Sequence, residues 1–214
     1  LARWHDDLWS LPPSLRESIS KVGGQRLRRI LTGLTNQKGQ SVCEKVFGSS
    51  RPDSNSIRRI VYFSDKEGKT RVVALLDYWS QTCLRPFHKW LMGHLKRIPQ
   101  DCTFNQGSFI GNTKSWEIFY SVDLTAATDR FPISFIVKLL KGRLPSYYVD
   151  SWVDIMVGYP FKSPSGQPIS YSVGNPMGAY SSWASFALAN HFVVFDCCLK
   201  LGIEWSTAKY FLLG

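Results

Sequence analysis

The stretch with the clearest potential for chemistry is S-V-D-L-T-A-A-T-D-R-F-P, residues 121–132. Two carboxylates, Asp123 and Asp129, enclose an uncharged run that follows an apolar segment. Carboxylates that converge at a strand end suit Mg²⁺, which proteins commonly hold with one or two carboxylates together with substrate phosphates. An alternative stays open on spacing alone, in which Asp129 caps a helix that Pro132 opens and Asp123 ends a solvated strand.

A glycine-rich segment, S-V-G-N-P-M-G-A-Y-S-S-W, occupies residues 172–183. Glycines such as Gly174 and Gly178 let a backbone approach a ligand closely. The hydroxylated residues after them enter a helical segment, and a helix N-terminus offers free N–H groups to an anion. A loop of this kind also serves simply as a turn, so the pattern alone leaves both interpretations open.

A third candidate is the basic turn D-K-E-G-K-T-R, residues 65–71. Lys66, Lys69 and Arg71 sit at or beside the turn. Arginine gives bidentate contacts to phosphate and lysine supplies a point charge, so a projecting basic turn can hold a triphosphate. The alternative is a charged turn that only keeps the surface soluble.

The elements around these residues follow from their patterns. The run 58–76 contains two β-branched and aromatic stretches joined by D-K-E-G, which predicts a β-hairpin. Asp77 is a suitable N-cap for a helix that ends near Arg97, before Pro99. Apolar residues alternate from Trp116 to Leu124, which predicts a half-buried strand with Asp123 on the opposite face.

The remaining segments are assigned more coarsely. We expect helices over 132–141 and 179–200, a loop-rich region over 158–176 and a strand over 205–213. Residues 1–56 are expected to be helical and loop-like, with a polar linker at 48–56.

The composition of the chain indicates which kinds of partner it suits. The chain has 214 residues, 44% of them hydrophobic, and a formal net charge of +10 that is concentrated in its N-terminal part. This suits a polyanion such as nucleic acid, or an anionic membrane surface. No uninterrupted apolar run approaches the roughly 18 residues of a membrane span, so none is expected. The chain begins with Leu and ends in an apolar run, so we expect an excerpt of a longer protein.

The five cysteines are odd in number and form no C-x-x-C pair, which argues against a zinc ribbon or a disulfide framework and fits a reducing compartment. The adjacent Cys197 and Cys198 are expected to pack as small apolar side chains.

The three candidate segments together are more specific than any one of them. A nucleotidyl-transfer enzyme needs a basic element for the incoming triphosphate, acids for metal, and a loop for template and ribose. Two-metal catalysis of this kind stabilises the attacking and leaving oxygens of an in-line displacement. The order basic hairpin, acid pair, glycine-rich loop therefore favours such an enzyme.

These segments resemble the polymerase motifs of a known family. S-V-D-L-T-A-A-T-D-R-F-P resembles motif A of mitovirus-type RNA-dependent RNA polymerases, and V-G-N-P-M-G-A-Y-S-S-W resembles motif B. G-K-T-R-V-V, with the following D-Y-W-S-Q and L-R-P, is similar to the motif F region, and D-C-T-F-N-Q (101–106) also has the look of the family. The resemblance spans roughly 58–214.

The resemblance implies an α/β (α+β) right-hand polymerase fold, with part of the fingers and palm and no thumb. It implies three segments: 1–57 as a basic helical region of the fingers, 58–112 as fingers with the motif F hairpin, and 113–214 as palm. It also implies Mg²⁺ or Mn²⁺ as cofactor, an RNA template, a product strand and ribonucleoside triphosphates as partners, and the mitochondrion as location. No protein partner is evident.

The implied site residues fall into three groups. Asp123 would bind metal and Asp129 would recognise the ribose 2′-hydroxyl. Phosphate contacts would come from Lys66, Lys69 and Arg71. Ribose and template contacts would come from Gly174, Asn175, Gly178, Ser181 and Ser182. Asn175 stands where the family usually has Gln, and retains the amide one methylene shorter.

One further expectation and two alternatives accompany this resemblance. After Y-F-L-L-G the family continues with Asp-Asp, so we expect the chain to be inactive by itself. A relic of such a gene carried in a host genome would have no catalysis and could still bind RNA. A reverse transcriptase is disfavoured by Asp129, because DNA synthesis calls for a bulky side chain that excludes the ribose hydroxyl.

Overall fold

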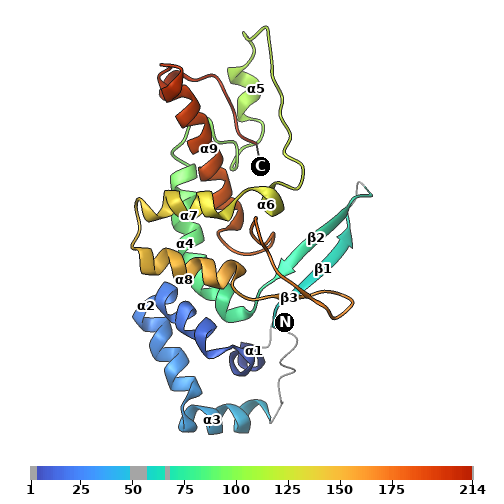
Figure 1. Cartoon of the computed structure of the whole chain (residues 1–214), viewed down its shortest axis with the longest axis vertical. Coiled ribbons are helices and arrows are strands. Elements are labelled where there is room, and N and C mark those ends of the chain that lie inside the picture. The colour runs from blue at the N-terminus through green and yellow to red at the C-terminus, as the bar shows by residue number, and fades with distance from the viewer. Residues whose placement is uncertain (1–3, 49–56, 66–67, 214) are drawn as a thin grey trace.

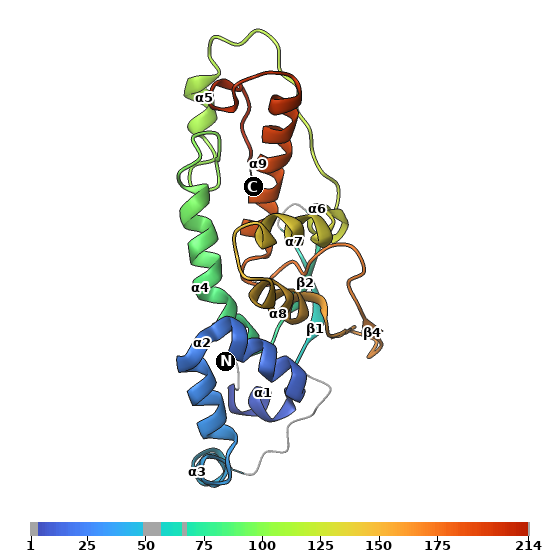
Figure 2. The ribbon, with the colours of Figure 1, turned by 60° about the vertical axis from the view of Figure 1, so that its left-hand side comes forward.

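The computed structural model describes residues 4–48, 57–65 and 68–213. The molecule is elongated, and a β-hairpin projects from its side (Figure 1). The helices are α1 (Trp4–Ser10), α2 (Pro13–Thr35), α3 (Gln37–Phe47), α4 (Tyr78–Leu95), α5 (Ser108–Asn112), α6 (Ala127–Arg130), α7 (Ile133–Lys141), α8 (Ser146–Val157) and α9 (Ser182–Lys200), followed by a 3₁₀ turn at Trp205–Thr207. Figure 2 shows α4 and α5 following one another along the long axis, with α9 beside them.

The described strands form one small mixed sheet. Its strands are β1 (Arg59–Ser64), β2 (Thr70–Leu75), β3 (Phe161–Lys162) and β4 (Pro168–Ile169), in the order β2-β1-β3-β4. The pair β1–β2 is antiparallel with Tyr62 opposite Val72, which confirms the predicted hairpin. The structure thus has the predicted mixture of helix and sheet, while the division into polymerase subdomains stays a prediction.

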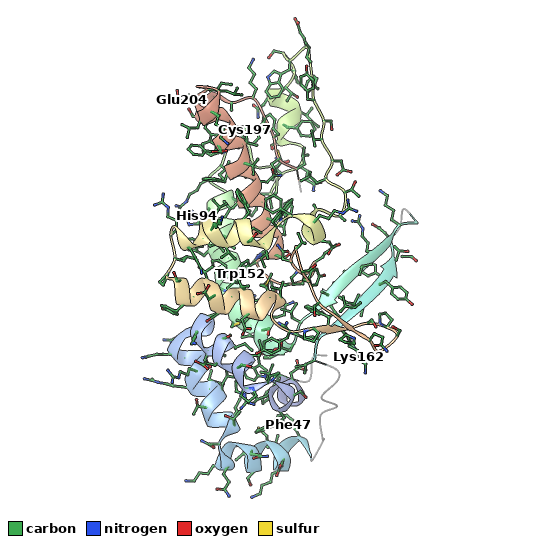
Figure 3. The ribbon with its side chains drawn as sticks, in the orientation of Figure 1. Phe47, His94, Trp152, Lys162, Cys197 and Glu204 are labelled. Atoms are coloured by element: carbon green, nitrogen blue, oxygen red, sulfur yellow. The ribbon has the colours of Figure 1, made fainter. Side chains whose placement is uncertain are left out.

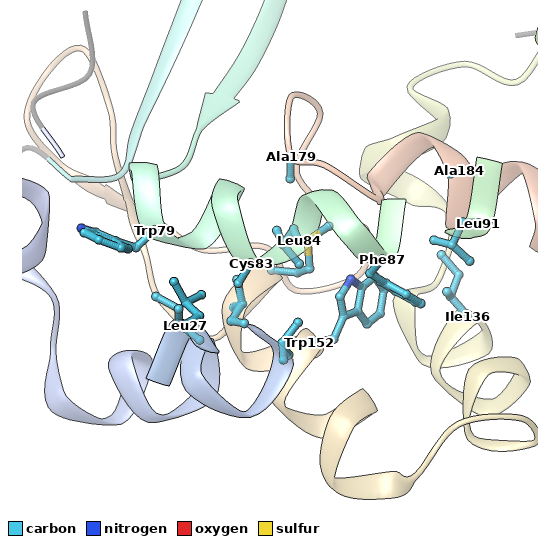
Figure 4. Packing of buried hydrophobic residues seen from close by; sticks show 14 of the residues in the cluster. Leu27, Trp79, Cys83, Leu84, Phe87, Leu91, Ile136, Trp152, Ala179 and Ala184 are labelled. Carbon is cyan, nitrogen blue, oxygen red and sulfur yellow. The ribbon is translucent and has the colours of Figure 1, made fainter. Parts of the chain in front are cut away.

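Helix α4 is the central support of the fold. The side chain of Asp77 accepts a hydrogen bond from the Ser80 backbone N–H at 2.7 Å, which confirms the predicted N-cap. The buried side of α4 carries Cys83, Leu84, Phe87 and Leu91, which pack with Trp152 of α8 (Figure 4). Helices α2, α7, α8 and α9 contribute to the same hydrophobic core.

A buried charge pair ties the hairpin to this core. Arg58 directly precedes β1, and its Nε lies 3.9 Å from Oδ2 of Asp77, with both side chains almost fully buried. Its guanidinium lies 5.2 Å from the Phe161 ring centre and donates to the carbonyls of Ile155 and Tyr159. Removal of one partner would leave an uncompensated buried charge, which is strongly destabilising. The base of the hairpin is therefore fixed relative to α4 and α8.

Helix α9 confirms the predicted helix over 179–200, apart from its first residues. By length and composition alone α9 could cross a membrane, but its first half is buried against α4 and α7. This is the pattern of a core helix. Cys198 is buried as expected, whereas Cys197 is exposed on the distal part of the helix (Figure 3), so the prediction for Cys197 is wrong. Successive residues on a helix point in different directions, and at this end of α9 the side that carries Cys198 is covered while its neighbours Cys197 and Leu199 are exposed.

Two strand predictions are wrong. Residues 118–124 are extended but pair with no described strand, and Tyr120 and Val122 are 92% and 83% exposed. Residues 205–213 form a 3₁₀ turn and a single bridge between Leu212 and Asp101. Alternation of apolar residues specifies which side chains share a face, but a strand also needs a neighbour for its backbone groups.

A buried hydrogen-bond relay holds the C-terminal segment against α9. Nε2 of His191 lies 3.0 Å from Oδ2 of Asp101, and Nδ1 lies 2.8 Å from the Tyr210 hydroxyl. The carboxylate can only accept, so Nε2 carries the proton and neutral Nδ1 accepts from Tyr210. The indole N–H of Trp205 in turn donates to the Tyr210 oxygen at 3.0 Å.

We expect the protein to lose stability as the pH falls below about 6.5, the ordinary pKa of histidine. Burial lowers the pKa of His191, although Asp101 opposes this shift. The unfolded chain then binds more protons than the folded chain between the lowered pKa and 6.5, so acid favours unfolding in this window. Urea midpoints measured from pH 5 to 8 should show this loss. The variant His191→Gln should flatten the curve and His94→Gln should not; equal slopes in all three would contradict the assignment.

Candidate functional site

The acid-bearing segment (121–132) and the glycine-rich loop (172–183) lie against each other. The backbone N–H of Asn175 donates to the carbonyl of Thr128 at 2.8 Å, and the N–H of Ile133 donates to the carbonyl of Val173 at 2.8 Å. A Cβ on Gly174 would overlap the carbonyl groups of Thr128 and Asp129. Only glycine therefore allows the glycine-rich loop to contact the acid-bearing segment this closely.

The same loop also contacts the hairpin. The N–H of Ala74 on β2 donates to the carbonyl of Met177 at 2.8 Å. Gly178 has a φ of 108°, and a Cβ there would lie 2.6 Å from Cγ1 of Val73. Figure 1 shows the loop after β4 passing between α6 and the hairpin. Segments predicted to act together, at 65–71, 121–132 and 172–183, thus belong to elements that the structure joins.

Asp129 lies in the short helix α6 at the contact between the segment and the loop. Ala126, at the N-cap of α6, has a left-handed φ of 50° and turns the chain there. Partial burial raises the pKa of Asp129. Burial also raises the pKa of Tyr171 to about 12, and the negative charge of Asp129 adds to this effect. Pro132 is the N-cap of α7 and no side chain caps it, so the structure does not support the alternative capping role of Asp129.

Asp123 lies on the exposed extended segment that leads into α6. No ion pair among the described residues involves Asp123 or Asp129. Within the described part of the chain, no group of three or more His, Cys, Asp or Glu side chains comes together as a metal site. The described residues therefore offer hard carboxylate oxygens but not a complete cage of protein ligands.

Lys69 and Arg71 lie at the turn end of the hairpin. Nε of Arg71 lies 2.9 Å from Oδ2 of Asp65, across the turn. Lys69 lies next to β2, and its carbonyl accepts from the N–H of Asp65 at 2.7 Å. Lys66 lies outside the described residues. A triphosphate would have to compete with Asp65 for Arg71, and its higher charge favours that exchange.

The polar residues of the glycine-rich loop are turned inward. Asn175, Ser181 and Ser182 are each no more than 2% exposed. The Ser182 hydroxyl donates to Oδ1 of Asn175, and the Ser181 hydroxyl accepts from the indole N–H of Trp152 at 2.8 Å. Nδ2 of Asn175 is buried and has no hydrogen-bond partner among the described residues. The ribose and template roles of these residues stay predictions.

Sequence reasoning missed three residues that hold this loop. Gln81 and His88 of α4 bind its backbone, and Trp152 of α8 binds Ser181. Gln81 ends the run D-Y-W-S-Q, which resembles the family sequence but whose residues have no role assigned from the sequence. The contact joins positions about 100 residues apart, so no local spacing could reveal it.

The acid-bearing segment and the base of the hairpin thus meet at the glycine-rich loop, and the basic side chains lie toward the other end of the hairpin. Carboxylates suit a hard divalent cation, and basic side chains suit phosphate. The arrangement is thus suited to a phosphate-bearing substrate that brings a metal ion with it.

Comparison with known proteins gives one family. The family model described as Mitovirus RNA-dependent RNA polymerase matches residues 4–214. The chain is 38% identical over 160 residues to the RNA-directed RNA polymerase of Cryphonectria parasitica mitovirus 1. This alignment covers 72% of the chain. Two uncharacterized mitochondrial proteins of Arabidopsis thaliana are 28% identical over 129 residues and 34% identical over 116 residues. These alignments cover 57% and 51% of the chain.

The chain spans only part of each relative: 19% of the viral polymerase, and 63% and 46% of the two plant proteins.

Proposed function

Because the chain belongs to the mitovirus RNA-dependent RNA polymerase family, we propose that it forms the RNA- and nucleotide-binding face of an RNA-directed RNA polymerase. The reaction would be template-directed transfer of nucleotides from ribonucleoside triphosphates to a product strand. The observation that carries the proposal is the junction of the acid-bearing segment, the glycine-rich loop and the hairpin. Asn175 N–H to Thr128 carbonyl and Ala74 N–H to Met177 carbonyl, each at 2.8 Å, link all three.

The proposed roles follow the chemistry of each side chain. Asp123 is the metal ligand, and Asp129 accepts a hydrogen bond from the ribose 2′-hydroxyl. Lys69 and Arg71, together with Lys66, hold the phosphates of the nucleotide. In the loop, the exposed Met177 and Gly178 contact template and ribose, while the buried Gly174, Asn175, Ser181 and Ser182 hold the loop behind them.

The chain can supply part of the ligands that Mg²⁺ or Mn²⁺ needs. Asp123 presents an exposed carboxylate on a segment next to α6, and hard cations in phosphoryl-transfer sites take only one or two carboxylates from the protein. The remaining ligands would come from the triphosphate, from water and from elsewhere in the enzyme. The metal would stabilise charge on the attacking and leaving oxygens.

The relatives favour a mitochondrial location. Two of them are named mitochondrial proteins of a plant, and the third is the polymerase of a mitovirus. We therefore place the proposed activity in the mitochondrion.

A second candidate function is binding of RNA without catalysis. It is suggested by the similarity to two uncharacterized mitochondrial proteins of a plant. On this second proposal, the chain is a relic of a polymerase gene carried in a host genome. Both candidates predict RNA binding. Only the first predicts nucleotide incorporation, so an incorporation assay distinguishes them.

Single-stranded RNA should bind the chain with an affinity that falls steeply with salt, because basic side chains release counterions from phosphates. The double variant Lys69→Ala/Arg71→Ala should bind more weakly, and the slope of log affinity against log salt should become shallower by about 0.7 for each phosphate that the variant no longer neutralises. Fluorescence anisotropy with a labelled oligoribonucleotide, at salt concentrations from about 50 to about 200 mM, measures the affinity and its dependence on salt.

Lys200→Ala is the matched control, since Lys200 is an exposed lysine in an ion pair with Asp196, on α9. It should leave the slope unchanged. Salt-insensitive binding, or a double variant that behaves as the control does, would overturn the role assigned to the hairpin.

A further inference from the structure

One face of α4 holds the backbone of the glycine-rich loop. Gln81 and His88 are seven residues apart, two helical turns, and so lie on the same side of the helix. Nε2 of Gln81 donates to the carbonyl of Gly178 at 2.9 Å, and Oε1 accepts from the N–H of Tyr180 at 2.9 Å. A single amide thus satisfies a donor and an acceptor of the loop at once.

His88 supplies the next contact along the loop. Its Nδ1 accepts from the N–H of Ser181 at 3.3 Å, and its ring centre lies 5.2 Å from that of Tyr180. The acceptor role requires an unprotonated Nδ1. Trp152, which is fully buried, donates to the Ser181 hydroxyl from the other side.

The backbone that these residues hold is unusual. Ser181 has a φ of 73° and Gly178 a φ of 108°. A non-glycine residue rarely adopts a left-handed φ, and it persists only where its surroundings hold it there. The contacts of Gln81, His88 and Trp152 all lie at this stretch, Gly178–Ser181. On its other side the loop is fixed to β2 through Met177.

We propose that Gln81 and His88 are positioning residues that hold the positive-φ residues Gly178 and Ser181 in place and thereby present the exposed Met177 and Gly178 to RNA. This inference rests on the proposed function, because it assigns the loop to RNA contact. It goes beyond that function in placing control of the loop on α4, a helix that carries none of the predicted site residues. A role in packing alone would not depend on the hydrogen-bonding groups of these side chains.

Two variants at Gln81 test the proposal. Gln81→Met keeps the size of the side chain and removes both hydrogen bonds, whereas Gln81→Glu keeps the acceptor for Tyr180 but sets a carboxylate oxygen against the carbonyl of Gly178. We expect the affinity for single-stranded RNA to fall about tenfold in Gln81→Met, as for the loss of two net hydrogen bonds, and by no less in Gln81→Glu. Gln40→Met, at an exposed glutamine of α3, is the control and should bind as the unaltered chain does.

Amide hydrogen exchange reports the loop without RNA. Gln81→Met should speed exchange at Tyr180, and His88→Phe, which keeps an aromatic ring but has no acceptor, should speed it at Ser181. Leu91, in the buried part of α4, should keep its protection in both variants.

The outcomes separate this proposal from the proposed function. Unchanged exchange, or faster exchange with unchanged RNA affinity, would overturn the positioning role alone. Failure of the unaltered chain to bind RNA at low salt would overturn the proposed function, and this inference with it.

Discussion

Gly174→Ala should lower the free energy of unfolding by about 2–3 kcal/mol and abolish RNA binding, as expected for overpacking in a site that cannot relax. The new Cβ would overlap the carbonyls of Thr128 and Asp129, which are backbone groups and cannot rotate away. The loop must therefore move off the acid-bearing segment, and the hydrogen bond from Asn175 to Thr128 breaks with it. Urea unfolding and RNA anisotropy on the same samples measure the two effects.

Gly93→Ala provides the matched control, because Gly93 lies in α4 and a Cβ there meets nothing within 4 Å. Alanine is favoured over glycine inside a helix, so this variant should be neutral or gain up to about 1 kcal/mol. A Gly174→Ala protein as stable as the control, with its RNA affinity intact, would show that the loop does not depend on this close approach.

Local patterns predicted the elements that frame the site. The charged D-K-E-G turn between two β-branched runs identified the hairpin, and Asp77 identified the start of α4. Both depend on contacts between residues close in sequence, which spacing records directly. The helices over 132–141 and 179–200 followed for the same reason.

Contacts between distant residues could not be predicted in this way. The alternation from Trp116 to Leu124 marked two faces but not a partner strand, and the segment is exposed without one among the described residues. Gly174 and Gly178 were interpreted as places where the backbone meets a ligand. In the structure the close approach is to the chain itself, at Thr128 and at Val73. The bond from Ser181 to Trp152 likewise joins α8 to the loop and leaves no local signature.

Asp123→Asn should have the largest effect on catalysis. The substitution keeps the size of the side chain and removes the negative charge that a divalent cation requires. A catalytic metal contributes several kcal/mol of transition-state stabilisation, and each 1.36 kcal/mol is a factor of ten, so nucleotide incorporation should fall by about 10³-fold or more. Asp123 is exposed and makes no ion pair among the described residues, so the stability of the fold should not change.

Glu117→Gln is the control, since Glu117 is an exposed acid that directly precedes the same segment and the change in charge is identical. The decisive measurement is Mg²⁺-dependent, template-directed incorporation of ribonucleotides by a polymerase that contains this chain and continues through the Asp-Asp pair of the family. Our account predicts incorporation that Glu117→Gln retains and Asp123→Asn loses. Full activity in Asp123→Asn would contradict the metal-ligand assignment, and no incorporation by the unaltered protein would favour RNA binding without catalysis.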